Sequence, residues 1–202
     1  MPERIRIFID FWNFQLQWNA TAKDKKIDWK ILTQTLLDET SKITKINNYQ
    51  YNGCKVYTSI NMDTQEGGKL KGWLKTFLDR QPGINIEIRE RKPHLKPIHC
   101  RECHQNIDDC PRCDKPIKRA VEKGVDAAII TDMFSLAWAD AYTVAILVTS
   151  DADYVPAVEN LQAKGFKIIN ATWENIGYQL AGTCWASFNI DKLVPKLTRS
   201  YR

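Results

Sequence analysis

Residues 144–156 read VAILVTSDADYVP, and they give the strongest indication of the fold class. Its first five residues are an unbroken apolar run, which is typical of a strand buried on both faces of a parallel sheet. Asp151 and Asp153 follow the run closely, and Pro156 fits the first turn of the helix that we predict over 153–163. A buried strand that leads into a helix is part of the unit from which α/β proteins are built.

The rest of the chain alternates between strand and helix patterns in the same way. An apolar run over 4–9 ends at Asp10, and Ile84, Ile86 and Ile88 alternate with polar residues, as in an edge strand. Further strands are predicted over 54–60 and 166–171, and further helices over 125–139, from about Asp28 onward and from Asp63 onward. This alternation predicts an α/β fold with a parallel sheet and right-handed crossovers.

The composition is that of one folded domain. The chain has 202 residues, of which 44% are hydrophobic and 26% charged, and this excludes disordered, collagenous and low-complexity proteins. We therefore treat 1–202 as a single domain that carries one insertion over 93–118. No apolar run approaches the ~20 residues that cross a bilayer, and Asp10 comes too early for a secretory signal. These features predict a cytoplasmic protein with no membrane partner.

The charges are unevenly distributed along the chain. The net charge is +5, yet residues 120–160 contain seven acidic residues and a single Lys. A basic body around an acidic segment suits a polyanion held near a bound metal. Two unrelated solvated surfaces would give the same counts, so charge alone does not decide between these interpretations.

Four of the six cysteines have the spacing C-x2-C-x6-C-x2-C, at Cys100, Cys103, Cys110 and Cys113. Two such pairs form two tight turns, and four thiolates close a tetrahedral site that selects Zn²⁺, with an iron–sulfur cluster as the distant second choice. Disulfides are the alternative, but a reducing compartment disfavours them. Because four sulfur ligands leave no open position for water, we expect the zinc to be structural.

Acidic residues stand where strands of the predicted sheet end. Asp10 ends the first strand, and Asp151 and Asp153 come just after the strand of 144–149. Ligands of open parallel sheets bind beyond the carboxyl ends of the strands. These carboxylates therefore converge on one crevice if the two strands are neighbours.

Asp126 and Asp132 lie at or near the start of the intervening helix and add to the same acidic segment. Two carboxylates ~4 Å apart repel by about 4 kcal/mol at an effective dielectric of 20, so such a cluster calls for a cation. Hard oxygen ligands select Mg²⁺ or Mn²⁺, and such a metal activates water for attack on a phosphodiester. Taken singly, Asp153 can be a helix N-cap and Asp126 a turn residue, and these alternatives stay open.

Three motifs follow one another along the chain. They are FIDFWN at 8–13, KGVDAAIITD at 123–132 and VAILVTSDADYVP at 144–156, and GFKII follows at 165–169. The first resembles the F-I-D-x-x-N opening of NYN domains, the PIN-like ribonucleases of the LabA-like group. The second is similar to their K-G-V-D segment with a further aspartate, and the third to their strand followed by S-G-D-x-D-F and V-P. The resemblance covers about residues 4–190.

This resemblance implies a PIN-like Rossmannoid fold of three layers around a mostly parallel sheet, and metal-dependent cleavage of RNA. Carried over by position, the carboxylates of the Mg²⁺ or Mn²⁺ site would be Asp10, Asp126, Asp151 and Asp153. Asn13 would orient this site, and Asp132 is a weaker candidate for it. The cysteine insertion lies where some relatives carry a zinc module.

Two positions depart from the family pattern. Phe11 and Ser150 stand where the family usually has glycine, beside Asp10 and Asp151. Bulk at these positions narrows the site, supplies a ring on which bases stack, or marks a member that binds RNA without cutting it.

We therefore expect a metal-dependent ribonuclease that acts on single-stranded RNA. Trp12, Phe11 and Phe14 are candidates for stacking on unpaired bases, and basic residues such as Arg89 and Arg91 are candidates for contacts with phosphates. The alternative is a catalytically weak regulatory module that binds nucleic acid or protein through the zinc insertion, and a homodimer stays open. A haloacid-dehalogenase phosphatase is disfavoured, because Trp12 occupies the position of its second aspartate.

Overall fold

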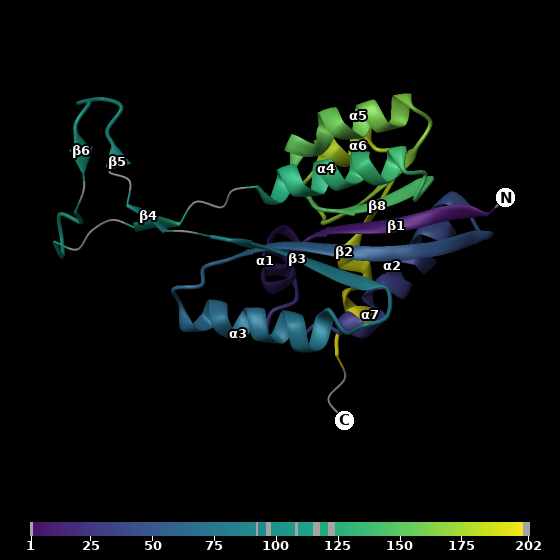
Figure 1. Ribbon diagram of the computed structural model, residues 1–202, viewed down its shortest axis with the longest axis horizontal. Coiled ribbons are helices and arrows are strands. Elements are labelled where there is room, and N and C mark those ends of the chain that lie inside the picture. Colours follow the sequence, from purple (N-terminus) through teal and green to yellow (C-terminus); the bar gives the residue numbers. More distant parts are fainter. Residues whose placement is uncertain are drawn as a thin grey trace.

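The computed structural model describes residues 2–91, 93–95, 98–107, 109–114, 118–120 and 124–199. The strands of its main sheet are β1 (Glu3–Asp10), β2 (Tyr49–Ile60), β3 (Ile84–Glu90), β8 (Val144–Val148), β9 (Lys167–Thr172) and β10 (Ala186–Asn189). They lie in the order β10-β9-β8-β1-β2-β3 (Figure 1). Every neighbouring pair is parallel, so the predicted α/β fold with a parallel sheet is confirmed.

Helices cover both faces of this sheet (Figure 1). One face carries α1 (Phe11–Thr21), α2 (Trp29–Thr44), α3 (Gln65–Trp73) and α7 (Val194–Leu197), and the other carries α4 (Val125–Trp138), α5 (Val155–Ala163) and α6 (Tyr178–Thr183). The short helical turns are η1 (Leu74–Leu78), η2 (Ala152–Tyr154) and η3 (Ile190–Leu193). Among the described helices, none is long and apolar enough to cross a membrane.

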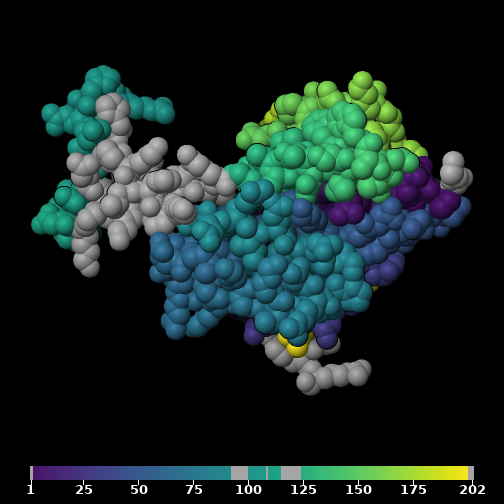
Figure 2. Space-filling model, viewed as in Figure 1, coloured from purple at the N-terminus to yellow at the C-terminus, as the bar shows by residue number. Residues whose placement is uncertain are grey.

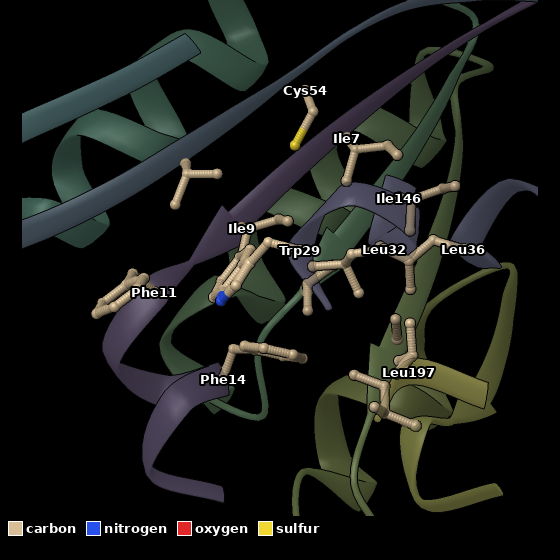
Figure 3. Packing of buried hydrophobic residues seen from close by; sticks show 14 of the residues in the cluster. Ile7, Ile9, Phe11, Phe14, Trp29, Leu32, Leu36, Cys54, Ile146 and Leu197 are labelled. Atoms are coloured by element: carbon tan, nitrogen blue, oxygen red, sulfur yellow. The ribbon is translucent and has the colours of Figure 1, made fainter. Parts of the chain in front are cut away.

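The side chains of β1 alternate between two cores, one on each face of the sheet. Ile5, Ile7 and Ile9 belong to the core beneath α1 and α2, whereas Phe8 belongs to the core beneath α4 and α5. Figure 3 shows part of the first core. The neighbouring strand β8 is buried along its whole length, as its apolar run predicts. Burial on both faces fixes the register that places Ile9 opposite Val148.

Most of the predicted elements occur where the patterns place them. Asp28 caps α2 by accepting a hydrogen bond from the N–H of Lys30 at 3.0 Å, and β3 is an edge strand, as its alternation predicts. The patterns do not predict α1, α6, α7 or β10. Helix α1 follows β1 without a loop, since Asp10 is both the last residue of the strand and the N-cap of the helix. Strand β10 has only four residues, of which Phe188 alone is buried, so its pattern is weak.

A small arm follows β3 and stands apart from the main body (Figures 1 and 2). It contains β4 (Pro93–Leu95), β5 (Ile98–His99), β6 (Asn106–Ile107) and β7 (Lys118–Ala120). β4 pairs antiparallel with β7, and β5 pairs antiparallel with β6. The arm overlaps the segment 93–118 that is predicted to be an insertion, of which residues 96, 97, 108 and 115–117 lie outside the described part.

We expect Leu36→Ala to lower the free energy of unfolding by about 2–5 kcal/mol, because the substitution leaves a cavity. The Leu36 side chain is fully buried on α2 and points toward Ile146 of β8 (Figure 3). Leu16→Ala on α1 is the matched control, since Leu16 is 58% exposed, and it should change the stability by no more than about 0.5 kcal/mol. Urea denaturation measures both, and equal losses would contradict the assigned core.

Candidate active site

Two neighbouring strands end at one edge of the sheet and lead into acidic residues. β1 and β8 are parallel neighbours, with Ile9 opposite Val148, so Asp10 and the loop that begins at Thr149 leave the sheet at the same edge. The convergence predicted for Asp10 and Asp151 requires that their strands be neighbours. That condition is confirmed.

Asp10 is held between its strand and the helix that follows. Its carboxylate accepts a hydrogen bond from the backbone N–H of Asn13 at 3.1 Å and so caps α1, and the residue is only 7% exposed. The side-chain oxygen of Asn13 accepts a hydrogen bond from the N–H of Ser150 at 2.9 Å. Asn13 therefore ties the start of α1 to the loop after β8, and it holds the two acidic segments in one arrangement.

Asp151 stands at the turn between β8 and α5. Its side chain accepts a hydrogen bond from the N–H of Asp153 at 2.9 Å and caps the short turn η2. The cap is thus Asp151, and the interpretation of Asp153 as the helix N-cap is wrong. Asp153 is exposed and is the middle residue of η2.

Tyr154 contacts one of the carboxylates directly. The Tyr154 side chain is fully buried, and its hydroxyl donates a hydrogen bond to Oδ1 of Asp126 at 2.9 Å. Burial raises the pKa of Tyr154 well above its ordinary value, and the negative charges of Asp10, Asp126 and Asp151 raise it further. The phenol therefore stays protonated as a donor, and all three carboxylates lie within electrostatic reach of it.

Sequence reasoning does not identify Tyr154. The sequence contains one small hint of its role. The family pattern has phenylalanine after the second aspartate, and this chain has tyrosine at that position. The difference is one hydroxyl group, and that hydroxyl is the group that binds Asp126.

Asp132 belongs to a separate set of contacts. Its carboxylate accepts hydrogen bonds from the ammonium group of Lys55 and from the hydroxyl of Tyr57, the latter at 2.7 Å. Partial burial raises the pKa of Asp132, but the bonds from Lys55 and Tyr57 outweigh this, and the pKa lies below its usual value. Lys55 also pairs with Glu87 at 2.7 Å. Asp132 thus faces a cation of the protein itself.

The two residues that replace family glycines point away from the carboxylates. The Phe11 ring is 2% exposed and stacks on Trp29, with ring centroids 5.7 Å apart, in the core on the other face of the sheet. The hydroxyl of Ser150 lies 3.0 Å from that of Thr172 on β9. Phe14 is also fully buried. The stacking of bases predicted for Phe11 and Phe14 is therefore wrong, because both rings are core residues.

Trp12 lies differently from its two aromatic neighbours. It is partly exposed, and its indole N–H donates to the backbone carbonyl of Ser59 at the end of β2, at 2.6 Å. The guanidinium of Arg91 lies over the Trp12 ring, 5.8 Å from its centroid, and donates to the Ser59 hydroxyl at 2.8 Å. A basic group and an aromatic ring therefore stand together at the carboxyl edge of the sheet.

The cysteines of the arm form two turns of the same kind. In the first, the N–H groups of Cys103 and Glu102 donate to the sulfur of Cys100 and lower the pKa of its thiol. In the second, the N–H groups of Arg112 and Cys113 do the same for Cys110. The backbone repeats as well, since the fourth residue after each first cysteine, His104 or Asp114, has a positive φ and donates its N–H to that cysteine's carbonyl.

Neither predicted metal site is assembled in the part of the chain that the structure describes. No three or more His, Cys, Asp or Glu side chains within it are grouped closely enough to hold a metal ion. This holds for the carboxylates around Tyr154 and for the four cysteines of the arm. Lys123, the first residue of the K-G-V-D segment, lies outside the described residues. Both metal sites stay predictions.

Comparison with known proteins agrees with the fold. The model of the NYN domain family matches residues 4–188. Among solved structures, the chain is similar to VPA0982 from Vibrio parahaemolyticus, a protein of unknown function, with 17% sequence identity, a TM-score of 0.55 and coverage of 94% of this chain and 95% of that chain. At this identity the likeness supports the fold alone. No curated protein matches the sequence. The match over nearly the whole chain shows that it belongs to the NYN domain family, within the PIN-like nuclease superfamily.

Proposed function

We propose that this protein is a metal-dependent ribonuclease that hydrolyses phosphodiester bonds of single-stranded RNA. Membership of the NYN family, whose domains generally act on RNA, supports nuclease activity at the family level. The observation on which the proposal rests is the geometry of this edge of the sheet. Asp10 and the loop of Asp151 leave neighbouring strands at the same edge, and Tyr154, three residues after Asp151, donates a hydrogen bond to Asp126.

The proposed ligands of the Mg²⁺ or Mn²⁺ are Asp10, Asp126 and Asp151, together with the exposed Asp153. Carboxylate oxygens are the ligands that these ions prefer, and neighbouring carboxylates repel each other unless a cation lies between them. A bound divalent ion lowers the pKa of water and stabilises the leaving oxygen of a phosphodiester. The protein's part is to hold the carboxylates: Asp10 through the cap of α1, and Asp126 through the hydroxyl of Tyr154.

Single-stranded RNA is the proposed substrate because its bases are free to stack on side chains, unlike the bases of a duplex. Trp12 and Arg91 support this choice. Their contact places a partly exposed ring beside a cation at the edge of the sheet where the carboxylates lie. A cation of this kind suits a phosphate, and the ring suits an unpaired base.

We also propose that the arm binds one structural Zn²⁺ through Cys100, Cys103, Cys110 and Cys113. The repetition of the turn supports this, because in both pairs backbone N–H groups donate to the first sulfur and favour its thiolate form. The thiolate is the form in which a cysteine binds zinc. Each turn supplies two sulfurs, and the two turns together supply the four ligands of one zinc ion.

The carboxylates are tested by Asp10→Asn and Asp151→Asn. Each substitution should abolish Mn²⁺-dependent cleavage of a labelled single-stranded RNA and leave the stability unchanged or slightly higher, because it removes one charge from a repelling group. Asp132→Asn should have a smaller effect. Asp24→Asn, in an exposed loop, is the matched control and should retain full activity. Full activity in both site variants would overturn the assignment.

The hydroxyl of Tyr154 is tested by Tyr154→Phe. Loss of the donor to Asp126 should lower Mn²⁺ affinity or activity about 10–100-fold, the range typical of groups that position metal ligands. Tyr142→Phe is the matched control, since its hydroxyl is equally buried but donates to the backbone carbonyl of Met133 at 2.7 Å. A titration of activity against Mn²⁺ compares them. Equal effects of the two variants would mean that Tyr154 only supports the core.

Elemental analysis tests the zinc. Freshly purified protein should contain about one zinc ion per chain, and Cys110→Ser should lose it while the main sheet stays folded, because the arm is separate from both cores. Cys184→Ser is the control: burial raises the pKa of this thiol to about 12, and the residue lies outside the arm. Zinc-free wild-type protein would refute the proposal.

A further inference from the structure

A concave site lies on the other face of the sheet from Tyr154. It is a pocket of about 690 Å³ between α1, the segment that leads into α2, and α3 with η1. Phe11 and Trp12 of the first turn of α1 line it, so it begins where Asp10 ends. Its volume falls in the range of sites for small molecules and cofactors.

Aromatic rings form the inner surface of this pocket. Trp29 and Phe11 are almost fully buried and stack on each other, which makes a firm floor. Trp73 and Phe77 are partly exposed and stack with centroids 5.7 Å apart. The Trp73 ring stands edge-on to Trp29, 6.0 Å away. The pocket therefore contains a partly exposed flat ring, Trp73, beside the buried rings of Trp29 and Phe11.

Basic side chains surround the opening. Among the described residues that line the pocket, four are basic, namely Lys25, Lys26, Lys30 and Arg199, and one is acidic, namely Asp28. The Asp28 carboxylate accepts the N–H of Lys30 and caps α2. The opening of the pocket, called the rim below, therefore carries a net positive charge. Asp28, its one acidic residue among those described, is engaged in capping α2.

The rim is also held in place by the backbone. The indole N–H of Trp18 donates to the carbonyl of Lys25 at 2.8 Å, and the N–H of Arg199 donates to the carbonyl of Lys26 at 2.8 Å. The N–H of Asp28 donates to the carbonyl of Leu197 at 2.8 Å. Because these bonds order the rim before anything binds, a ligand loses less entropy on entering.

We infer that this pocket binds an unpaired nucleotide of the RNA strand, next to the nucleotide whose phosphodiester is cut. This inference rests on the proposed function. Aromatic rings stack on bases, and lysine and arginine bind phosphates; the pocket combines both within one small volume. An apolar peptide would leave the four cations without partners. A strand that crosses the carboxyl edge over Asp10 meets the carboxylates on one side of the first turn of α1 and this pocket on the other.

The ring is tested with Trp73→Leu and the conservative Trp73→Phe. Affinity for a fluorescein-labelled single-stranded RNA is measured by anisotropy without added Mg²⁺ or Mn²⁺, so that no cleavage is required. Trp73→Leu should weaken binding by about fivefold to hundredfold, the cost of one lost stack, and Trp73→Phe should recover most of it. Equal binding by all three proteins would overturn the inference.

The rim is tested with Lys30→Glu, which changes an exposed side chain and leaves the core intact. The matched control is Lys164→Glu, exposed at the end of α5 on the opposite face. Lys30→Glu should weaken binding of single-stranded RNA and lower the slope of its salt dependence by about 0.7, the value for one phosphate contact. The control should do neither. Equal effects of the two variants, or a loss seen only with an acidic peptide as probe, would refute a nucleotide site.

A base-free phosphodiester separates failure of this inference from failure of the proposed function. Bis(p-nitrophenyl) phosphate with Mn²⁺ reports on the carboxylates alone, so Trp73→Leu and Lys30→Glu should hydrolyse it as wild type does. Wild-type protein that binds RNA through the pocket but cleaves no phosphodiester supports the pocket and overturns the nuclease. Cleavage of RNA with unchanged affinity in the pocket variants overturns the pocket and keeps the nuclease.

Discussion

The parallel pairing of β1 with β8 determines the positions of both cores and of the acidic edge. Both strands are buried between two helical layers, so their side chains anchor the register from both faces. A shift by one residue would exchange the cores of Ile9 and Phe8 and is strongly disfavoured. The same register sets Asp10 beside the loop of Asp151. Burial of apolar side chains therefore brings the two acidic segments to the same edge of the sheet.

Hydrogen bonds between distant elements hold the acidic edge in place once the core has positioned the strands. Asn13 links α1 to the loop after β8 by accepting the N–H of Ser150, and Tyr154 reaches from η2 to Asp126 at the start of α4. Each contact joins two elements that are distant in the sequence. The acidic edge is thus built from three separate segments: the start of α1, the loop after β8 with η2, and the start of α4. Hydrogen bonds between these segments hold them in place.

Much of this could be predicted from the sequence, because it depends on local patterns. The apolar run of 144–148 and the alternation of 84–88 indicate a central and an edge strand without further information. Strand ends then place the aspartates at the carboxyl edge, since parallel strands share that edge. The family motifs add the order of the elements, and the match over residues 4–188 agrees with them.

What the sequence does not reveal depends on packing between distant elements. Phe11 follows Asp10 directly, yet α1 turns its ring into the opposite core against Trp29, so closeness in sequence misleads about its role. The partner of the Tyr154 hydroxyl is set by where α4 lies, and no local pattern carries that information. The cysteine spacing predicts two turns, but the distance between these turns depends on how the rest of the arm folds.

The wide separation of β1 and β8 along the chain has a consequence for how the protein is made. Ile5 pairs with Val144, whereas β2 and β3, on the other side of β1, both precede β8 in the sequence. Contacts between such distant residues make folding slow relative to that of helical proteins of similar size. During synthesis, the emerging chain therefore carries Asp10 without Asp151 until the segment after β8 has been made. The acidic edge is completed only when Asp151, 141 residues after Asp10, has been synthesised.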